Sequence, residues 1–158
     1  MKEKTCMFTG HRTLPERDEV IIKKHLEKEV EKLILEGIAS FLAGGALGFD
    51  TLCAETILKL KEKYPYIQLI LILPCENQTR GWIEKDIQKY QWIKSQADTV
   101  KILSPHYYRD CMHARNRHLV EQSAYCICYL IHSTGGTAYT VEYAAKNGVQ
   151  IIPIFPAK

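Results

Sequence analysis

Short apolar runs alternate with longer amphipathic segments along the whole chain, and this alternation constrains the fold more than any other feature. The strand-like runs cover residues 5–8, 38–42, 67–73, 99–103, 124–131 and 150–155. Helix-like segments separate them, at 49–63, 82–95, 112–122 and 137–146, after a first long helix. Such alternation favours parallel strands joined by right-handed crossovers. We therefore predict an open, doubly wound α/β sheet with mostly parallel strands, in a single domain over residues 1–158.

The first long helix carries the clearest boundary signals. Thr13 and Glu16 have the spacing of a capping box, which places the helix start at Thr13. Gly37 marks its end. One apolar stripe runs along it, at Ile22, Leu26, Val30, Leu33 and Ile34.

Composition limits the possible partners. The chain has 158 residues, 46% hydrophobic and 25% charged, which suits one packed core. Its net charge of +3 is too mild for a nucleic-acid footprint, so we do not expect nucleic acid as a partner. No apolar run approaches the ~20 residues of a membrane span, and the first residues lack a signal-peptide pattern. We expect a cytoplasmic protein that does not enter a membrane.

Six cysteines are present, at Cys6, Cys53, Cys75, Cys111, Cys126 and Cys128. None forms a Cys-x-x-Cys pair, and Cys126 and Cys128 would share one face of a strand. Reduced, mostly buried thiols are the expected state. A metal site is the weaker alternative, because no second Cys/His pair has ligand spacing. We expect no metal and no cofactor.

A polar segment follows the first strand, at Thr9, Gly10, His11 and Arg12. Ligands of doubly wound sheets sit beyond the carboxyl ends of the strands. Gly10 lets the backbone approach a ligand, and Arg12 can make a bidentate contact to phosphate. A plain strand-to-helix turn with exposed polar residues is the alternative.

Glycines also follow the second strand. Gly44 and Gly45 precede a predicted helix, so their backbone N–H groups would form an anion site at its N-terminus. Residues 44–50 fit neither the Walker pattern nor the dinucleotide fingerprint. Asp50 either takes part in this site or only caps the helix.

A third glycine loop follows the fifth strand and opens a helix, at Ser133, Gly135, Gly136 and Thr137. This is again the geometry that binds phosphate. Thr137 either caps the helix or binds the anion. Glu142 lies a turn and a half further on, and either faces the pocket or is a surface carboxylate.

Arg115 and Asn116 lie near the start of the helix predicted at 112–122 and also suit an anion, although basic residues on helices often face solvent. His11 and His113 are candidate general bases or surface histidines. Trp82 and the pair Tyr107 and Tyr108 either stack on a base or pack against the protein. Because parallel strands bring their following loops to one edge, we expect the glycine pairs and the arginines to meet there.

These motifs resemble the YpsA-like branch of the SLOG superfamily, whose other branches include the LOG phosphoribohydrolases and the DprA proteins. The resemblance covers nearly the whole chain. It rests on residues 8–12 and 44–50, on Gln78, Trp82, Arg115 and Asn116, and on residues 135–137 with Thr140, Tyr143 and Ala144. It implies a Rossmann-like fold and a nucleotide-derived ligand, such as an ADP-ribose-like or cyclic nucleotide signal. SLOG-type domains often pair, so the resemblance also implies a homo-oligomer.

The LOG branch cleaves nucleoside 5'-monophosphates to a free base and ribose 5-phosphate. It uses the arginine of a Met-His-x-Arg-Lys run and the glutamate of a Gly-Gly-x-Gly-Thr-x-x-Glu run. Residues 112–116 look like the first run, so Arg115 matches its arginine, and Glu142 matches the glutamate of the second. Ala138 and Tyr139 replace the Gly and Thr of that pattern, and we expect them to crowd the phosphate loop.

The sequence leaves three functions open. In the first, the domain senses or sequesters a nucleotide derivative, with phosphates on the two glycine-pair loops and with Arg12 and Arg115 pairing with their charge. In the second, it is a LOG-like N-glycosidic hydrolase in which Glu142 and Arg115 are catalytic. In the third, it binds single-stranded nucleic acid as DprA does, which the mild net charge disfavours. We expect a binding module rather than an enzyme.

Overall fold

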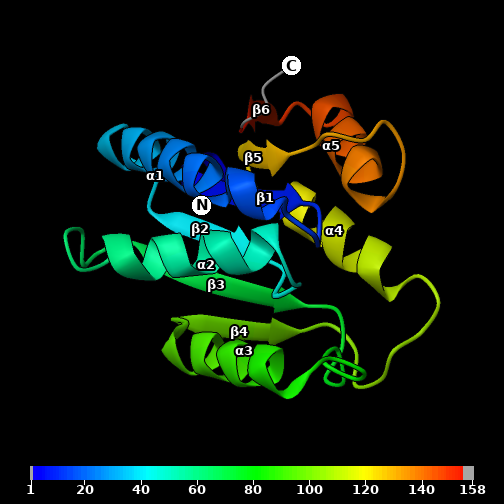
Figure 1. The fold of residues 1–158 in the computed structure, drawn as a ribbon. Helices are drawn as coiled ribbons and strands as arrows, with labels where there is room; N and C mark the ends of the chain where they lie inside the picture. Colours follow the sequence, from blue (N-terminus) through cyan, green and yellow to red (C-terminus); the bar gives the residue numbers. More distant parts are fainter. Residues whose placement is uncertain (1, 155–158) are drawn as a thin grey trace.

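Six strands form one sheet in which every neighbouring pair is parallel (Figure 1). The computed structural model describes residues 2–154. The strands are β1 Thr5–Gly10, β2 Ser40–Ala43, β3 Gln68–Leu73, β4 Thr99–Ile102, β5 Tyr125–Tyr129 and β6 Gln150–Pro153. They lie in the order β4-β3-β2-β1-β5-β6. The predicted Rossmann-like parallel sheet is confirmed.

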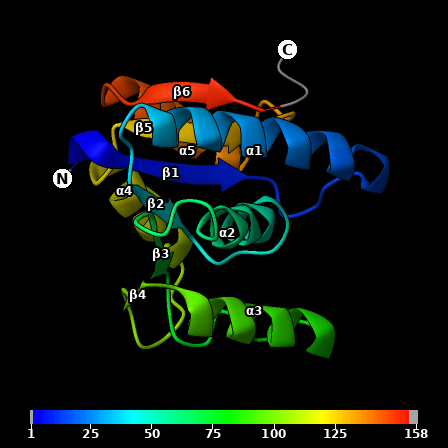
Figure 2. The same ribbon diagram turned by 90° about the vertical axis from the view of Figure 1, so that its left-hand side faces the viewer.

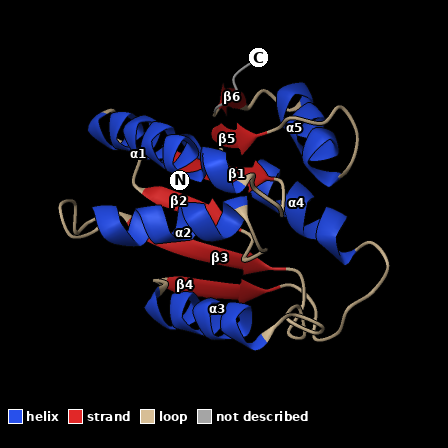
Figure 3. Cartoon of the chain, in the orientation of Figure 1, coloured by secondary structure: helices blue, strands red, loops and turns tan. Residues whose placement is uncertain are grey.

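Helices cover both faces of this sheet (Figures 1 and 3). They are α1 Glu19–Leu35, α2 Phe49–Leu60, α3 Glu84–Gln96, α4 Cys111–Glu121 and α5 Gly136–Lys146, with short 3-10 helices η1 Lys2–Lys4 and η2 Glu16–Asp18. Figure 2 shows α2 and α3 on one side of the strands and α4 on the other. Within residues 2–154, no helix combines the length and the apolar character that crossing a bilayer requires.

Two hydrophobic clusters, one on each face, form the core. Because side chains alternate along a strand, Phe8 of β1 joins the cluster under α1 and α2, and its neighbour Met7 joins the cluster under α4 and α5. Cys126 and Cys128 share the second cluster, as expected for residues two apart on a strand. All six cysteines are free and buried.

The direction of winding reverses beside β1. From β1 the chain steps outward through β2 and β3 to β4, and α4 then carries it back to β5 on the other side of β1. The loops that follow β1 and β5 therefore diverge to opposite faces of the sheet and leave a crevice at their carboxyl ends. This switch point is where doubly wound sheets bind ligands.

The predicted capping box at Thr13 is wrong. The chain enters η2 through Pro15 (φ −59°, ψ 126°), no side chain caps η2 or α1, and α1 begins only at Glu19. Pro15 disfavours helical backbone at the residue before it, so the helix cannot start at Thr13. The last strand is confirmed over Gln150–Pro153, and Phe155, which the prediction included, lies outside the described residues.

Gly48 allows the loop after β1 to approach the start of α2. Its φ is +77°, and a Cβ there would lie 2.6 Å from the His11 carbonyl oxygen. We predict that Gly48→Ala lowers the free energy of unfolding by about 3 kcal/mol, through backbone strain and overpacking together.

Gly37 provides the matched control, because its φ is +104° and a Cβ at this position would meet no atom within 4 Å. Gly37→Ala should cost only the backbone strain, about 1–2 kcal/mol. Urea denaturation gives the free energy of unfolding of both variants. Equal decreases would show that the close approach at Gly48 contributes nothing beyond backbone strain.

Candidate functional site

A cavity of about 270 Å³ opens at the switch point, beyond the carboxyl ends of β1 and β5. The structure brings ten of the predicted site residues to its lining: Thr9, Gly10, His11, Arg12, Asp50, Arg115, Asn116, Gly135, Gly136 and Thr137. Phe8, Ala46, Met112 and Thr134 complete it. These four lie within the predicted motifs, next to residues that the sequence indicates as candidates for the site.

His11 joins the three segments that frame the cavity. Its carbonyl oxygen accepts a hydrogen bond from the Phe49 amide at the start of α2 (3.1 Å). Its ring nitrogen Nε2 accepts one from the Ile131 amide after β5 (2.9 Å). An accepting Nε2 leaves the proton of the neutral ring on Nδ1. His11 is therefore a structural link, with its basic nitrogen already engaged.

Arg115 is buried behind the cavity and holds the loop after β2. Its Nη1 donates to the Gly44 carbonyl, and its Nε donates to Asn116 Oδ1 (2.7 Å). A Cβ at residue 44 would lie 2.6 Å from the Arg115 Cζ atom, so a larger residue would displace the Arg115 guanidinium. The Gly45 carbonyl accepts from Gln78 Nε2 (3.4 Å). Gly44 and Gly45 thus position buried polar side chains, and neither lines the cavity.

Asp50 lines the cavity from the first turn of α2, where Gly48 occupies the N-cap position and no side chain caps the helix. The carboxyl is buried, its Oδ2 accepts from the Ala46 amide (3.3 Å), and its Oδ1 has no hydrogen-bond partner among residues 2–154. Burial raises the pKa of Asp50, and the nearby Arg115 charge opposes that rise. The interpretation of Asp50 as only a helix cap is therefore wrong.

The third glycine loop presents the start of α5 to the cavity. Gly135 is the N-cap residue, so the suggestion that Thr137 caps this helix is wrong. No side chain caps α5, and its first backbone N–H groups have no partner within the helix. Such groups attract anions. Ser133 precedes this turn and does not line the cavity.

Glu142 lies away from the cavity. Thr140 and Ala144 form the buried side of α5, and Glu142, two residues from each, projects on the other side. Its side chain is 70% exposed and pairs weakly with Lys146 (4.0 Å). Tyr139 packs edge-on against His113 with ring centroids 4.9 Å apart and does not line the cavity. The expected crowding of the loop by Tyr139 is therefore absent.

Fold and site together define a Rossmann-like domain with glycine-bearing loops at its switch point. The model of the YspA SLOG family (YpsA) matches residues 8–151. The chain belongs to this family, which confirms the resemblance found in the sequence.

Two relatives show how far the similarity extends. UPF0398 protein BH1768 of Halalkalibacterium halodurans is 34% identical over 132 residues, covering 82% of this chain and 70% of the relative. A UPF0398 protein of Bacillus thuringiensis is 29% identical over 130 residues, and the match covers 80% of this chain and 71% of the relative.

A solved structure of DNA processing protein A from Helicobacter pylori, a protein with a single-stranded DNA binding mode, shares the fold. Its TM-score is 0.66 at 18% identity, and the match covers 94% of this chain and 64% of that one. This chain thus spans less than two thirds of that protein's length, and the likeness concerns the fold alone.

Replacing Arg115 tests whether it supports the site. We predict that Arg115→Met lowers the free energy of unfolding by about 3 kcal/mol, because it removes the positive charge nearest to the buried Asp50 and the donor to Gly44. Urea denaturation of Arg115→Met, Asp50→Asn and the double variant gives the coupling. The free energy of unfolding of the double variant should fall by less than the sum of the falls in the two single variants. Strict additivity of these changes would show that the two residues act independently.

The lowered pKa of His11 predicts that the folded protein loses stability in acid. Burial lowers its pKa below the ordinary 6.5, and His132 lowers it further. The unfolded chain then binds a proton at higher pH than the folded one does, so stability falls as the pH drops through 6.5 toward the folded pKa. Burial lowers the pKa of His118 as well, so it contributes in the same direction.

Urea midpoints measured from pH 7.5 to 5 test this expectation. His11→Gln and His118→Gln should each flatten the acid side of the curve. An unchanged slope in His11→Gln would show that the ring does not lose its proton affinity on folding.

Proposed function

We propose that this protein binds a phosphorylated, nucleotide-derived ligand in the cavity at the switch point, and that it senses or sequesters that ligand. One observation carries the proposal: donors for an anion and a buried acceptor without a partner border the same cavity. The donors are the first amides of α5 and the Arg12 guanidinium, and the acceptor is Asp50 Oδ1.

Charge and hydrogen-bonding capacity favour a sugar phosphate over a simple anion. Arg12 makes no ion pair within residues 2–154, so its charge is available to a phosphate. Asp50 Oδ1 is an acceptor, and a ribose hydroxyl supplies the donor that satisfies it. A ligand that carries both a phosphate and a ribose therefore contacts both Arg12 and Asp50.

Binding without turnover agrees with the position of the candidate catalytic groups. The hydrolase alternative assigns the central role to Glu142, which lies on the outer side of α5. His11 uses its Nε2 to accept from Ile131. Neither group offers a free base to a ligand in the cavity, which counts against a hydrolase that uses Glu142 or His11 as its base.

Arg12 gives the direct test. We predict that AMP and ADP-ribose raise the melting temperature of the wild type, and that Arg12→Met weakens their binding about tenfold or more through loss of a charged phosphate contact. Arg17→Met removes another exposed arginine, in η2, that does not line the cavity, and this variant should bind as the wild type does.

Chromatography of each incubated ligand separates the outcomes. Intact ligand supports a sensor or a sequestering protein, whereas release of free base and ribose 5-phosphate supports the hydrolase. Equal binding by the Arg12 and Arg17 variants would contradict the proposed phosphate contact.

Single-stranded nucleic acid is the second candidate. The structure that shares the fold belongs to a protein with a single-stranded DNA binding mode. Tyr107 and Tyr108 are exposed in the loop after β4, and exposed Arg109 follows them, which is the pairing of aromatic and basic groups that such ligands use. Fluorescence anisotropy with an oligothymidylate would favour this candidate if binding is micromolar at low salt and is lost as salt rises.

A further inference from the structure

A second cavity, of about 320 Å³, adjoins the first at the carboxyl edge of the sheet. Its lining comes from the loops after β1, β3 and β4 and from the start of α4. It consists of Arg12, Asn77, Gln78, Arg80, Trp82, Tyr107 and Met112. Arg12 and Met112 line both cavities. The two spaces therefore meet at these two side chains, within reach of a single extended ligand.

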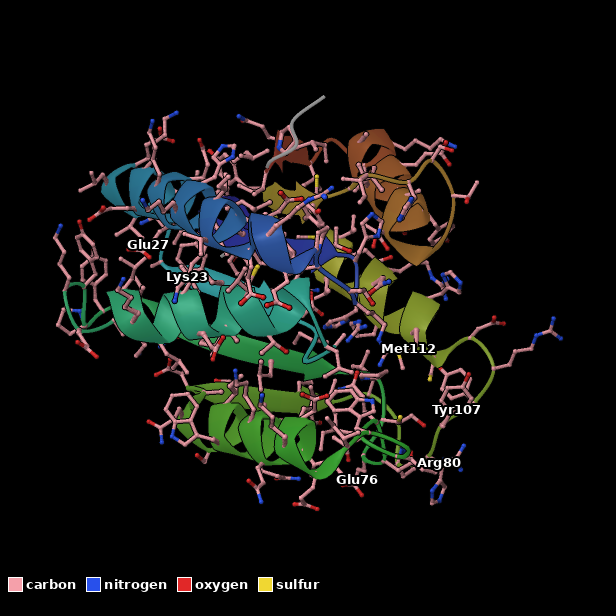
Figure 4. The ribbon with its side chains drawn as sticks, in the orientation of Figure 1. Lys23, Glu27, Glu76, Arg80, Tyr107 and Met112 are labelled. Carbon is pink, nitrogen blue, oxygen red and sulfur yellow. The ribbon has the colours of Figure 1, made fainter. Side chains whose placement is uncertain are left out.

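Two aromatic side chains and two arginines border this second cavity. Figure 4 shows Arg80, Tyr107 and Met112 gathered at the end of the sheet to which the arrows of β3 and β4 point. The Arg12 guanidinium lies over the Trp82 ring, 5.9 Å from its centroid, and Trp82 is held edge-on against the buried Tyr90. Arg80 has no ion pair within the described part of the chain. Aromatic faces beside unpaired cations suit a flat ring attached to an anionic group.

Gln78 adds a buried side-chain acceptor next to the Tyr90 hydroxyl. The residue is buried, with a relative exposure of 6%. Nε2 donates to the Gly45 carbonyl, which orients the amide, and Oε1 has no hydrogen-bond partner among residues 2–154. A buried acceptor left in this state is costly, so a ligand that donates to it gains binding energy. An exocyclic amino group of a nucleobase is such a donor.

We propose that the second cavity is a base-binding subsite, in which an amino-bearing purine stacks on Trp82 and Tyr107 and donates to Gln78 Oε1. This inference rests on the proposed function, because it places the sugar phosphate of the same ligand in the first cavity. The link between base and sugar phosphate passes Arg12 and Met112. The ligand is then an adenine or guanine nucleotide, or a larger molecule that contains one, and a sugar phosphate alone fills only half of the site.

Fluorescence reports the stacking directly. The chain has two tryptophans, and Trp92 lies half-exposed on α3, outside both cavities. In a Trp92→Phe background, Trp82 is the only tryptophan. We expect AMP and ADP-ribose to quench its emission, and ribose 5-phosphate to bind without quenching it.

Calorimetry with the same three probes and with inosine 5'-monophosphate completes the test. Trp82→Leu and Tyr107→Ala should each weaken the binding of AMP about tenfold or more, because each removes a stacking partner. The affinity of both variants for ribose 5-phosphate should stay within about twofold of the wild-type value. The inosine nucleotide, with a carbonyl in place of the amino group, should bind more weakly than AMP to the wild type. Tyr66→Ala is the matched control, because Tyr66 is similarly exposed but precedes β3 at the opposite edge.

The outcomes separate the two proposals. If AMP and ribose 5-phosphate bind equally well and Trp82 emission does not change, the base subsite is wrong and the phosphate site stands. If AMP quenches Trp82 but binds no more tightly than the inosine nucleotide, the donor to Gln78 is wrong. If no probe binds the wild type, both proposals fail.

Discussion

The two hydrogen bonds of His11 are the interaction on which the site depends. Its carbonyl ties the end of β1 to the first amide of α2, and its ring ties the same point to the chain after β5. A parallel sheet places these segments at one edge but does not fix the distance between them, because the following helices diverge to opposite faces. A single residue that bridges both sides sets that distance. Gly10 and Gly48 then act as spacers, since a Cβ at either would strike Phe49 or the backbone of residues 11 and 12.

The alternation of apolar runs and amphipathic segments is sufficient to predict every strand, the parallel pairing and the helices on both faces. The predicted helix starts are wrong where a local sequence motif conflicts with the backbone conformation. At Thr13, the spacing of a capping box outweighs the proline inside it, although Pro15 excludes the helical conformation that the box requires. At α5, Thr137 is the polar candidate for the cap, whereas Gly135 takes that position without any side-chain hydrogen bond. Element type follows from periodicity, and the exact end of a helix follows from single backbone angles.

The site is predictable where residue type and loop position are enough. Arg12, Asp50 and the third glycine loop reach the cavity as expected. Gly44 and Gly45 do not, because the chain uses their carbonyls to hold Arg115 and Gln78. The side on which Glu142 projects depends on the rotation of α5, which Thr140 and Ala144 set by their burial. The second cavity escapes motif analysis because its lining comes from four separate segments, and no spacing in the sequence relates residues 77–82 to Tyr107.

Meeting at one edge is weak evidence for a ligand, because every loop that follows a strand of a parallel sheet reaches the same edge, whether or not it binds anything. The stronger evidence is the state of the buried polar atoms. Asp50 and Gln78 each retain one oxygen without a partner among residues 2–154, and each borders a different one of the two adjoining cavities. Leaving a buried acceptor unsatisfied costs about 1–3 kcal/mol, so two such atoms weigh heavily on a domain of this size. Within residues 2–154, these two acceptors border the same cavities as Arg12 and Arg80, which make no ion pair in that range. This is the arrangement expected of a surface completed by a ligand that brings both an anion and hydrogen-bond donors.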